Sequence, residues 1–250
     1  MKALVPIALT ALLAVGVAIA LFATPPAEEL LAAYATPLEG RVRGQRLNAG
    51  LALSKLDGAV ILPGAEFSFN KVVGTWSRDE GYRKAPVSFN GQLVWTWGGG
   101  VCQTSSTLYN TALLAGMEIT ERHRHRFAPG YIAPGRDAAV AYSNIDLRFR
   151  NPHRWPVRIV AHVQDGRVVC EIFGRSRPKE RVAITQIVDS VREPRTLSDA
   201  KGTSGNVANP GKHGYGVTTF RIFRWPSGER RELLSRDSYP AMNRIIQRES

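Results

Sequence analysis

The chain has 250 residues, of which 44% are hydrophobic and 22% charged, and its formal net charge is +12 at pH 7. This composition excludes a disordered or low-complexity protein and is typical of a globular one. The positive charge favours an anionic partner such as lipid head groups or cell-wall polymers. We expect no nucleic acid, because no recognised binding motif accompanies the charge and the N-terminus indicates export.

Residues 1–24 predict a signal peptide or a membrane anchor. Lys2 precedes an almost wholly apolar run over 3–23, whose length lies between a long signal-peptide core and a short membrane-spanning helix. A weak cleavage site at 18–20 and the continuing apolar run favour an uncleaved anchor. Lys2 before the run and two glutamates after it orient the rest of the chain outward. We therefore expect an extracytoplasmic protein, either held in the membrane by its N-terminal helix or secreted to the cell wall.

The remaining chain predicts an α+β fold, mostly antiparallel strands with a few helices. Residues 25–40 read as a linker, residues 41–175 as the main domain, and residues 176–250 as a basic, partly β extension. A helix is expected over 46–56, strands over 60–62 and 66–70, and a hairpin around Asn90-Gly91. Further strands are expected over 117–121, 139–142, 145–150, 157–163 and 168–173. In the extension, strands over 182–188 and 218–223 flank a long loop over 201–216.

The most informative stretch is GGGVCQTSSTLYN, residues 98–110. Three glycines lead into a predicted helix that Gly116 would end. Cys102 lies at the start of this helix, where amide groups and the helix dipole would stabilise a thiolate and a developing oxyanion. The alternative is a buried structural cysteine on a tight turn. We favour a reactive thiol, with oxyanion or substrate-binding roles for five residues around it: Gly98, Gly99, Gly100, Gln103 and Ser105.

The second cysteine, Cys170, lies in an alternating strand-like run. Its face also carries Val168 and Ile172 and is wholly apolar. Export permits a disulfide with Cys102, but this pattern favours a reduced core residue.

A cysteine nucleophile needs a base, and usually a third group that orients the base. His123 and His125 lie on one face if their segment is extended, and Asp137 could fix the tautomer of the nearer ring. We choose His125 as the base, because it is nearer the turn that should return Asp137 to the site. His123 would then serve stability or substrate binding, and Arg136 would neutralise a substrate carboxylate. A His-x-His pair can bind zinc, but no further ligand spacing completes a site, so we expect no metal or cofactor.

Four motifs occur in order: PGAEFSFN (63–70), the cysteine stretch (98–110), ERHRH (121–125) and PGRDA (134–138). Over residues 41–175 the chain resembles the VanW family of exported bacterial proteins, named from a glycopeptide-resistance gene cluster. Some members look like L,D-transpeptidases that cross-link peptidoglycan through the cysteine of the glycine-rich motif. The motif differs from the signature of the better-known L,D-transpeptidase fold, so no fold is carried over. One departure is aromatic: Trp95 and Trp97 precede the glycines, as a sugar- or peptide-facing platform or as packing.

The resemblance implies that Cys102 attacks a stem-peptide carbonyl, with His125 as base and later acid and Asp137 as its orienting group. A neighbouring stem amine would then resolve the thioester. The sequence leaves two rivals open. One is a non-catalytic peptidoglycan-binding or glycopeptide-resistance accessory module, and the other is a cysteine peptidase or amidase with water as acceptor. The oligomeric state is not determined by any of these features.

Overall fold

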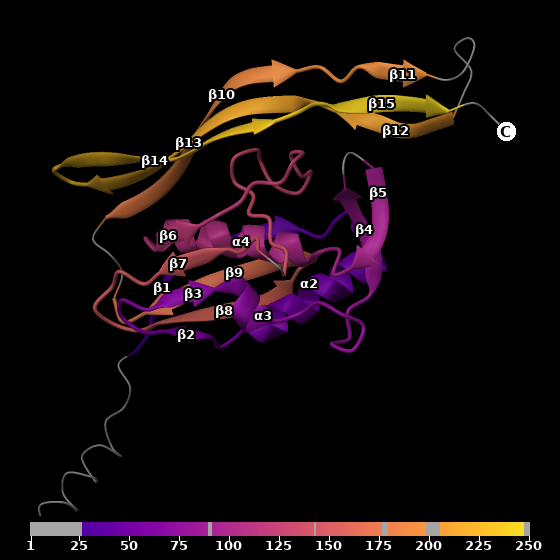
Figure 1. Cartoon of the computed structure of the whole chain (residues 1–250). Coiled ribbons are helices and arrows are strands. Elements are labelled where there is room, and N and C mark those ends of the chain that lie inside the picture. Colours follow the sequence, from indigo (N-terminus) through magenta and orange to yellow (C-terminus); the bar gives the residue numbers. More distant parts are fainter. Residues whose placement is uncertain (1–26, 90–91, 143, 177–179, 199–205, 248–250) are drawn as a thin grey trace, which may run out of the picture.

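The computed structural model describes residues 27–89, 92–142, 144–176, 180–198 and 206–247 (Figure 1). The expected signal peptide or anchor, residues 1–24, lies outside these ranges. Among the described residues, no helix combines the length and apolar character needed to cross a membrane.

The helices that the described residues form are short. They are α2 (Arg43–Leu56), α3 (Phe69–Val73) and α4 (Val101–Leu114). The strands of the N-terminal part are β1 (Glu29–Pro37), β2 (Val60–Ile61), β3 (Glu66–Ser68), β4 (Lys84–Phe89), β5 (Gln92–Trp97), β6 (Glu118–Glu121), β7 (Arg148–Arg150), β8 (Val157–Gln164) and β9 (Arg167–Gly174). The later strands are β10 (Arg181–Arg192), β11 (Thr196–Ser198), β12 (Asn206–Lys212), β13 (Gly214–Trp225), β14 (Gly228–Tyr239) and β15 (Met242–Gln247).

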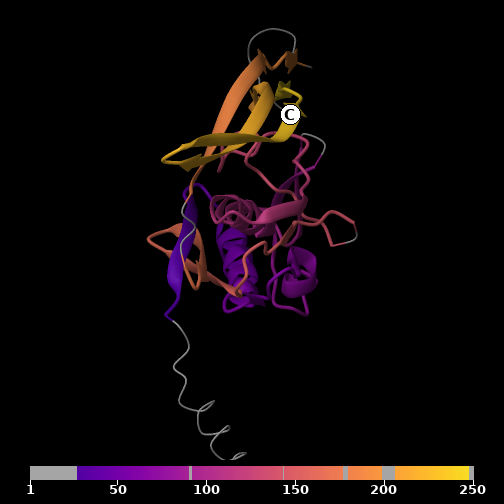
Figure 2. The ribbon, with the colours of Figure 1, turned by 90° about the vertical axis from the view of Figure 1, so that its left-hand side faces the viewer.

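The architecture confirms an α+β fold with mostly antiparallel strands. A four-stranded sheet in the order β1-β9-β8-β2 carries α2 and α4 on one face, as Figures 1 and 2 show. A small sheet β3-β7-β6 and the hairpin β4-β5 flank the helices. The described pairs are antiparallel, except that β11 runs parallel to β15.

Helix α4 is the buried centre of this arrangement. Its apolar side chains Leu108, Ala112 and Leu113 are fully buried. Two of its threonines bond to the sheet: Thr107 Oγ1 lies 2.8 Å from Thr36 Oγ1, and Thr111 Oγ1 donates to the Cys170 carbonyl at 3.1 Å. The polar run after Cys102 is thus internal, because its side chains find partners on neighbouring elements.

Glycine ends this helix, as the sequence predicts. Gly116 has a φ of 77°. Its amide donates to Leu113 O at 3.2 Å, and the amide of Met117 donates to Ala112 O at 2.9 Å. This paired bonding is the Schellman motif, which satisfies the last carbonyls of a helix.

The assignment of residues 25–40 as a linker is wrong over most of its length. Residues 29–37 form β1, which pairs with β9 at the edge of the main sheet, Tyr34 opposite Cys170. The buried Thr36 side chain binds α4, so this segment belongs to the folded domain. The Ala- and Glu-rich sequence does not indicate a strand, because the partner strand β9 lies far along the chain.

Three local predictions also need correction. Phe69 and Asn70, expected in a strand, begin α3, because the Ser68 side chain accepts from the Lys71 amide at 3.2 Å and caps the helix. Residues 139–142 form isolated bridges instead of a strand. Part of the expected loop over 201–216 is strand β12.

The two cysteines are free. Cys170 is fully buried on β9 among Val168 and Ile172, as the alternating pattern predicts. Burial raises the pKa of its thiol far above the ordinary value. It is therefore an inert core residue.

Candidate active site

Cys102 lies in the first turn of α4, where the glycine stretch enters the helix. Gly100 caps the helix with a φ of 113°. The Val101 amide donates to Gly98 O at 3.0 Å and the Gln103 amide to Gly100 O at 3.1 Å, so hydrogen bonds close the turn on both sides of the cysteine. Cys102 is half-buried, and its Sγ donates to the Val140 carbonyl at 3.5 Å. The thiol is thus held in place while part of the residue faces solvent.

Close packing explains why three glycines precede the cysteine. A Cβ on Gly98 would overlap the Trp76 indole, one on Gly99 would lie 2.8 Å from the Ala85 carbonyl oxygen, and one on Gly100 would overlap the Gln45 carbonyl. Two of these glycines also have positive φ values that side chains rarely adopt. The structure therefore gives these residues a packing role; their oxyanion role stays a prediction.

His125 and Asp137 meet beside the thiol. His125 Nδ1 and the Asp137 Oδ2 atom are 2.7 Å apart, and the His125 backbone amide donates to the same oxygen at 2.7 Å. With Nδ1 engaged, Nε2 is the ring nitrogen that is left for Cys102, and the ring lies near enough to that thiol to lower its pKa. The structure thus brings together the three residues that the sequence assigns to catalysis.

The electrostatics of the three residues favour a thiolate–imidazolium pair. Burial raises the pKa of Cys102, but the hydrogen bond and charge of His125 outweigh it and lower that pKa below the ordinary value. Burial lowers the pKa of His125, yet hydrogen bonds to Asp137 and Cys102 raise it to about 10. Burial likewise opposes ionisation of Asp137, but the His125 ring lowers its pKa to about 2. A thiolate is the nucleophilic form of cysteine.

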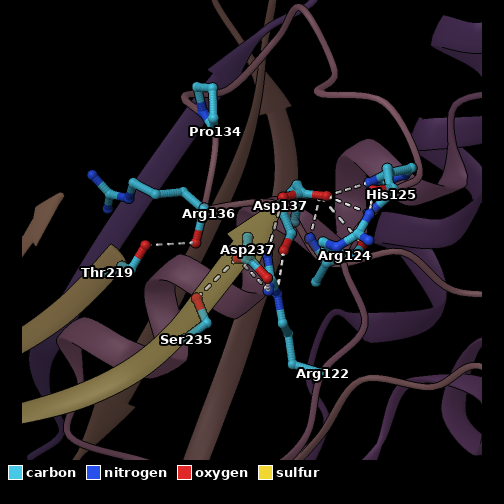
Figure 3. Close-up of polar contacts among 12 residues, drawn as sticks. Arg122, Arg124, His125, Pro134, Arg136, Asp137, Thr219, Ser235 and Asp237 are labelled. Carbon is cyan, nitrogen blue, oxygen red and sulfur yellow. Dashed lines mark hydrogen bonds and ion pairs between the residues drawn. The ribbon is translucent and has the colours of Figure 1, made fainter. Parts of the chain in front are cut away.

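Two further residues hold the Asp137 carboxylate, and sequence reasoning missed both. Arg122 Nη2 donates to Oδ1 at 3.0 Å, and the Tyr239 hydroxyl donates to the same oxygen at 2.5 Å. Figure 3 shows Arg122 between the carboxylates of Asp137 and Asp237. Arg122 lies inside the ERHRH motif, a signal that could have identified it. Tyr239 carries no local signal, because it lies 102 positions from its partner.

Hydroxyl groups of α4 form hydrogen bonds to Ala138, the residue after Asp137. Ser105 Oγ donates to Ala138 O at 2.6 Å. Ser106 Oγ accepts from the Ala138 amide at 3.0 Å and donates to Cys102 O at 2.7 Å. The Tyr131 hydroxyl also donates to Cys102 O, at 3.0 Å. Ser105 therefore positions the site from within the fold, while Ser106 and Tyr131 are additions to the predicted set.

Three predicted substrate-binding residues are not brought to the thiol. His123 pairs with Glu121, at 2.9 Å from Nε2 to Oε1. Gln103 is buried, and its amide donates to Pro37 O at 2.8 Å on β1.

The third is Arg136, whose guanidinium lies over the Tyr34 ring at 4.8 Å and donates to Asn110 Oδ1 at 2.6 Å. Figure 3 shows this side chain directed away from His125. These contacts lie on β1 and the middle of α4, which explains why sequence proximity to Asp137 did not place Arg136 at the thiol.

A different arginine approaches the cysteine. The Arg41 guanidinium carbon lies 4.8 Å from the centre of the Tyr131 ring, whose hydroxyl binds the Cys102 carbonyl. Arg41 Nε is buried and has no hydrogen-bond partner among the described residues. Burial lowers the pKa of this guanidinium, partly offset by Tyr131. A half-buried cation whose buried Nε has no partner among the described residues favours an anionic ligand.

Two surface hollows lie away from the triad. The first is lined by residues of the β1 end, α2 and the β8–β9 turn, including Leu38, Arg46, Asp165 and Arg167. The second is lined by residues around α3 and β7, including Asn70, Glu121, Tyr142 and Asp146. Neither hollow is lined by Cys102.

The arrangement supplies the parts of nucleophilic catalysis. Cys102 has the position that a nucleophile needs, the His125 ring that of a base and acid, and Asp137 that of the group that orients the ring. The Cys102 amide is among the first N–H groups of α4, which have no partner inside the helix and lie at the positive end of its dipole. Such donors stabilise the oxyanion of an acyl-transfer intermediate.

Comparison with known proteins places the site in a family. A family model described as "VanW like protein" matches residues 44–173, just over half of the chain. The uncharacterised protein YoaR of Bacillus subtilis (strain 168) is 36% identical over 143 residues, which cover 57% of this chain and 47% of that protein. The vancomycin B-type resistance protein VanW of Enterococcus faecalis (strain ATCC 700802 / V583) is 30% identical over 138 residues, covering 53% and 50%. The chain spans about half the length of these curated relatives. No solved structure matches.

Proposed function

This chain belongs to the VanW family, and on that premise we propose that it is an exported cell-wall enzyme acting on peptidoglycan stem peptides. The reaction is L,D-transpeptidase-type cross-linking through a thioester on Cys102. The observation that carries this proposal is the His125 ring, which is bonded to Asp137 at 2.7 Å and lies near enough to Cys102 to lower the pKa of its thiol. A nucleophile needs such a base, whereas a purely structural cysteine does not.

The reaction has two steps. The Cys102 thiolate attacks the carbonyl carbon of an L-centre of the donor stem, and the amide bond to the terminal D-amino acid breaks. Protonated His125 gives its proton to the leaving amine. A side-chain amine of a neighbouring stem then attacks the thioester, His125 takes the amine proton, and the carbon–sulfur bond breaks. The thiolate–imidazolium pair is thereby restored.

Arg41 takes over the carboxylate-binding role that the sequence assigned to Arg136. Its buried Nε lacks a partner among the described residues, and its guanidinium lies over Tyr131 beside the cysteine turn. The free carboxylate of a stem peptide is the anion that this donor fits. Arg124, whose guanidinium carbon lies 5.5 Å from the centre of the Tyr239 ring, adds positive charge nearby.

Peptidoglycan is the proposed partner, and an extracytoplasmic, membrane-anchored or secreted position is the proposed location. The apolar run over 3–23 and the net charge of +12 support both. The name of the Enterococcus relative, a vancomycin B-type resistance protein, supports a cell-wall setting.

A non-catalytic wall-binding or resistance accessory module is the second candidate. It is favoured by one observation: Trp95, on the hairpin that leads into the glycines, is 65% exposed. An exposed indole can stack on a sugar or a peptide. A third candidate, a peptidase or amidase, differs from the transpeptidase only in using water to resolve the thioester.

Intact-mass spectrometry of the full chain after incubation with tetrapeptide muropeptides tests the proposal. We expect a thioester adduct in the wild type and in Cys170→Ala, and none in Cys102→Ala. A cross-linked product identifies a transpeptidase, and a tripeptide product identifies the hydrolase. If no adduct forms while wild type and Cys102→Ala co-sediment equally with sacculi, the binding module is correct.

A further inference from the structure

We propose that the C-terminal unit, residues 181–198 and 206–247, is part of the active site. Tyr239 and Asp237 act as positioning residues that hold Asp137 and Arg122 and, through Asp137, the His125 ring. The proposal rests on the proposed function in taking Cys102 as the nucleophile. Both positioning residues lie beyond the segment that matches the family model, residues 44–173.

The Tyr239 hydroxyl bonds both to Asp137 and to the turn that precedes it, at Gly135. The hydroxyl donates to Asp137 Oδ1 at 2.5 Å and accepts from the Gly135 amide at 2.9 Å. Tyr239 is fully buried at the end of β14, and burial keeps its pKa well above the ordinary value. The hydroxyl therefore remains a proton donor to Asp137 throughout the working pH range.

Asp237 holds Arg122, the second side chain that donates to the Asp137 carboxylate. Arg122 Nη1 donates to both Asp237 oxygens, at 2.8 and 2.7 Å, while its Nη2 and Nε donate to Asp137 Oδ1 and to the Asp137 carbonyl. The three charged side chains are each 8% exposed or less. Removing one of these buried side chains leaves the charge of its partner uncompensated inside the protein.

The C-terminal unit also packs on the turn at Pro134 and Gly135, which precedes Asp137. Gly135, with a φ of 86°, leaves no room for a Cβ against Thr219 and lies against Val217 on β13. Gln186 on β10 donates to the Pro134 carbonyl, and Thr219 donates to the Gly135 carbonyl at 3.4 Å. Figure 3 shows Thr219 beside this turn, and Asp237 beside Arg122. The docking site is thus the turn before Asp137.

The unit contacts the cysteine helix at its far end as well, which supplies a matched control. Arg221 on β13 is buried and donates to Met117 O at 2.6 Å and to Leu113 O at 3.4 Å. A cation there complements the negative end of the helix dipole. Arg221 therefore joins the same two parts of the protein without touching the triad.

The test measures the rate of Cys102 alkylation by iodoacetamide against pH in the full chain, with the modified site assigned by peptide mass spectrometry. This readout needs no substrate. In Tyr239→Phe we expect a higher pH midpoint and a roughly three- to tenfold lower rate at pH 6, because a less firmly held His125 ring stabilises the thiolate less. Asp237→Asn should shift the midpoint in the same direction.

Arg221→Met should lower the melting temperature and leave the midpoint unchanged. Unchanged midpoints in Tyr239→Phe and Asp237→Asn, or an equal shift in Arg221→Met, would overturn the proposal, as would an ordinary thiol midpoint in the wild type. If the expected shifts occur but no acyl-enzyme forms with muropeptides, the proposed function fails and the positioning role stands.

Discussion

Asp137 accepts two hydrogen bonds from His125 at a single oxygen, Oδ2, one from ring Nδ1 and one from the backbone amide, each at 2.7 Å. One carboxylate therefore fixes both the ring and the main chain that carries it. The ring has little freedom to turn, so Nε2 is left for the thiol. An imidazole held in this way serves as base and then as acid without a change of orientation.

This relationship predicts different outcomes for the two neighbouring histidines. His125→Ala should lower single-turnover acyl-enzyme formation by roughly 10²–10⁴, the usual loss when a general base is removed. His123→Ala is the matched control, because its exposed ring pairs with Glu121 and should affect mainly stability. Mass spectrometry measures the adduct, and circular dichroism checks folding. A normal rate in His125→Ala would remove this ring from the mechanism.

The pKa directions predict a bell-shaped dependence of kcat/KM on pH. The rate should rise through the lowered pKa of Cys102, where the thiolate forms, and fall near pH 10, where His125 loses the proton that the leaving amine needs. Cys170, whose pKa burial raises, should remain unalkylated across this range. A single ascending limb at the ordinary cysteine value of about 8.5 would contradict the ion pair.

Two glycine-to-alanine substitutions should have opposite effects on the free energy of unfolding, because one glycine is closely packed and the other is not. Gly100→Ala places a Cβ against the Gln45 carbonyl at a φ of 113° and should cost roughly 2–5 kcal/mol of unfolding free energy. Gly50→Ala is the control, since its Cβ would meet no atom within 4 Å inside α2. That change should stabilise the protein by about 0.5–1 kcal/mol. Urea unfolding measures both, and a tolerated Gly100→Ala would show that the turn can relax.

Arg41→Met should impair recognition of the substrate carboxylate. The methionine retains apolar contact with Tyr131 but loses the charge, so we expect KM to rise about ten- to hundredfold with a smaller change in kcat. Arg43→Met, at an exposed position two residues away, should behave as wild type. A donor peptide with an amidated C-terminus should be insensitive to the change. Equal KM values for wild type and Arg41→Met would assign the carboxylate to another cation.

The sequence by itself determined those features that depend on neighbouring residues. Glycines at positions 100 and 116 mark the ends of α4, because each adopts a positive φ that other residues disfavour. The alternation around Cys170 predicted a buried, reduced thiol, as the structure shows. His125 and Asp137 lie only 12 positions apart, so a single turn could bring them together.

The tertiary structure alone decided which side chains surround that pair. Tyr239 and Asp237 reach Asp137 and Arg122 across 102 and 115 positions, and β1 joins the sheet through β9 at the other end of the domain. The tertiary packing also places the Arg136 guanidinium over the Tyr34 ring and the Arg41 guanidinium over the Tyr131 ring. Local patterns encode backbone conformation and which face is apolar, whereas the partner of a charge depends on how distant strands pack.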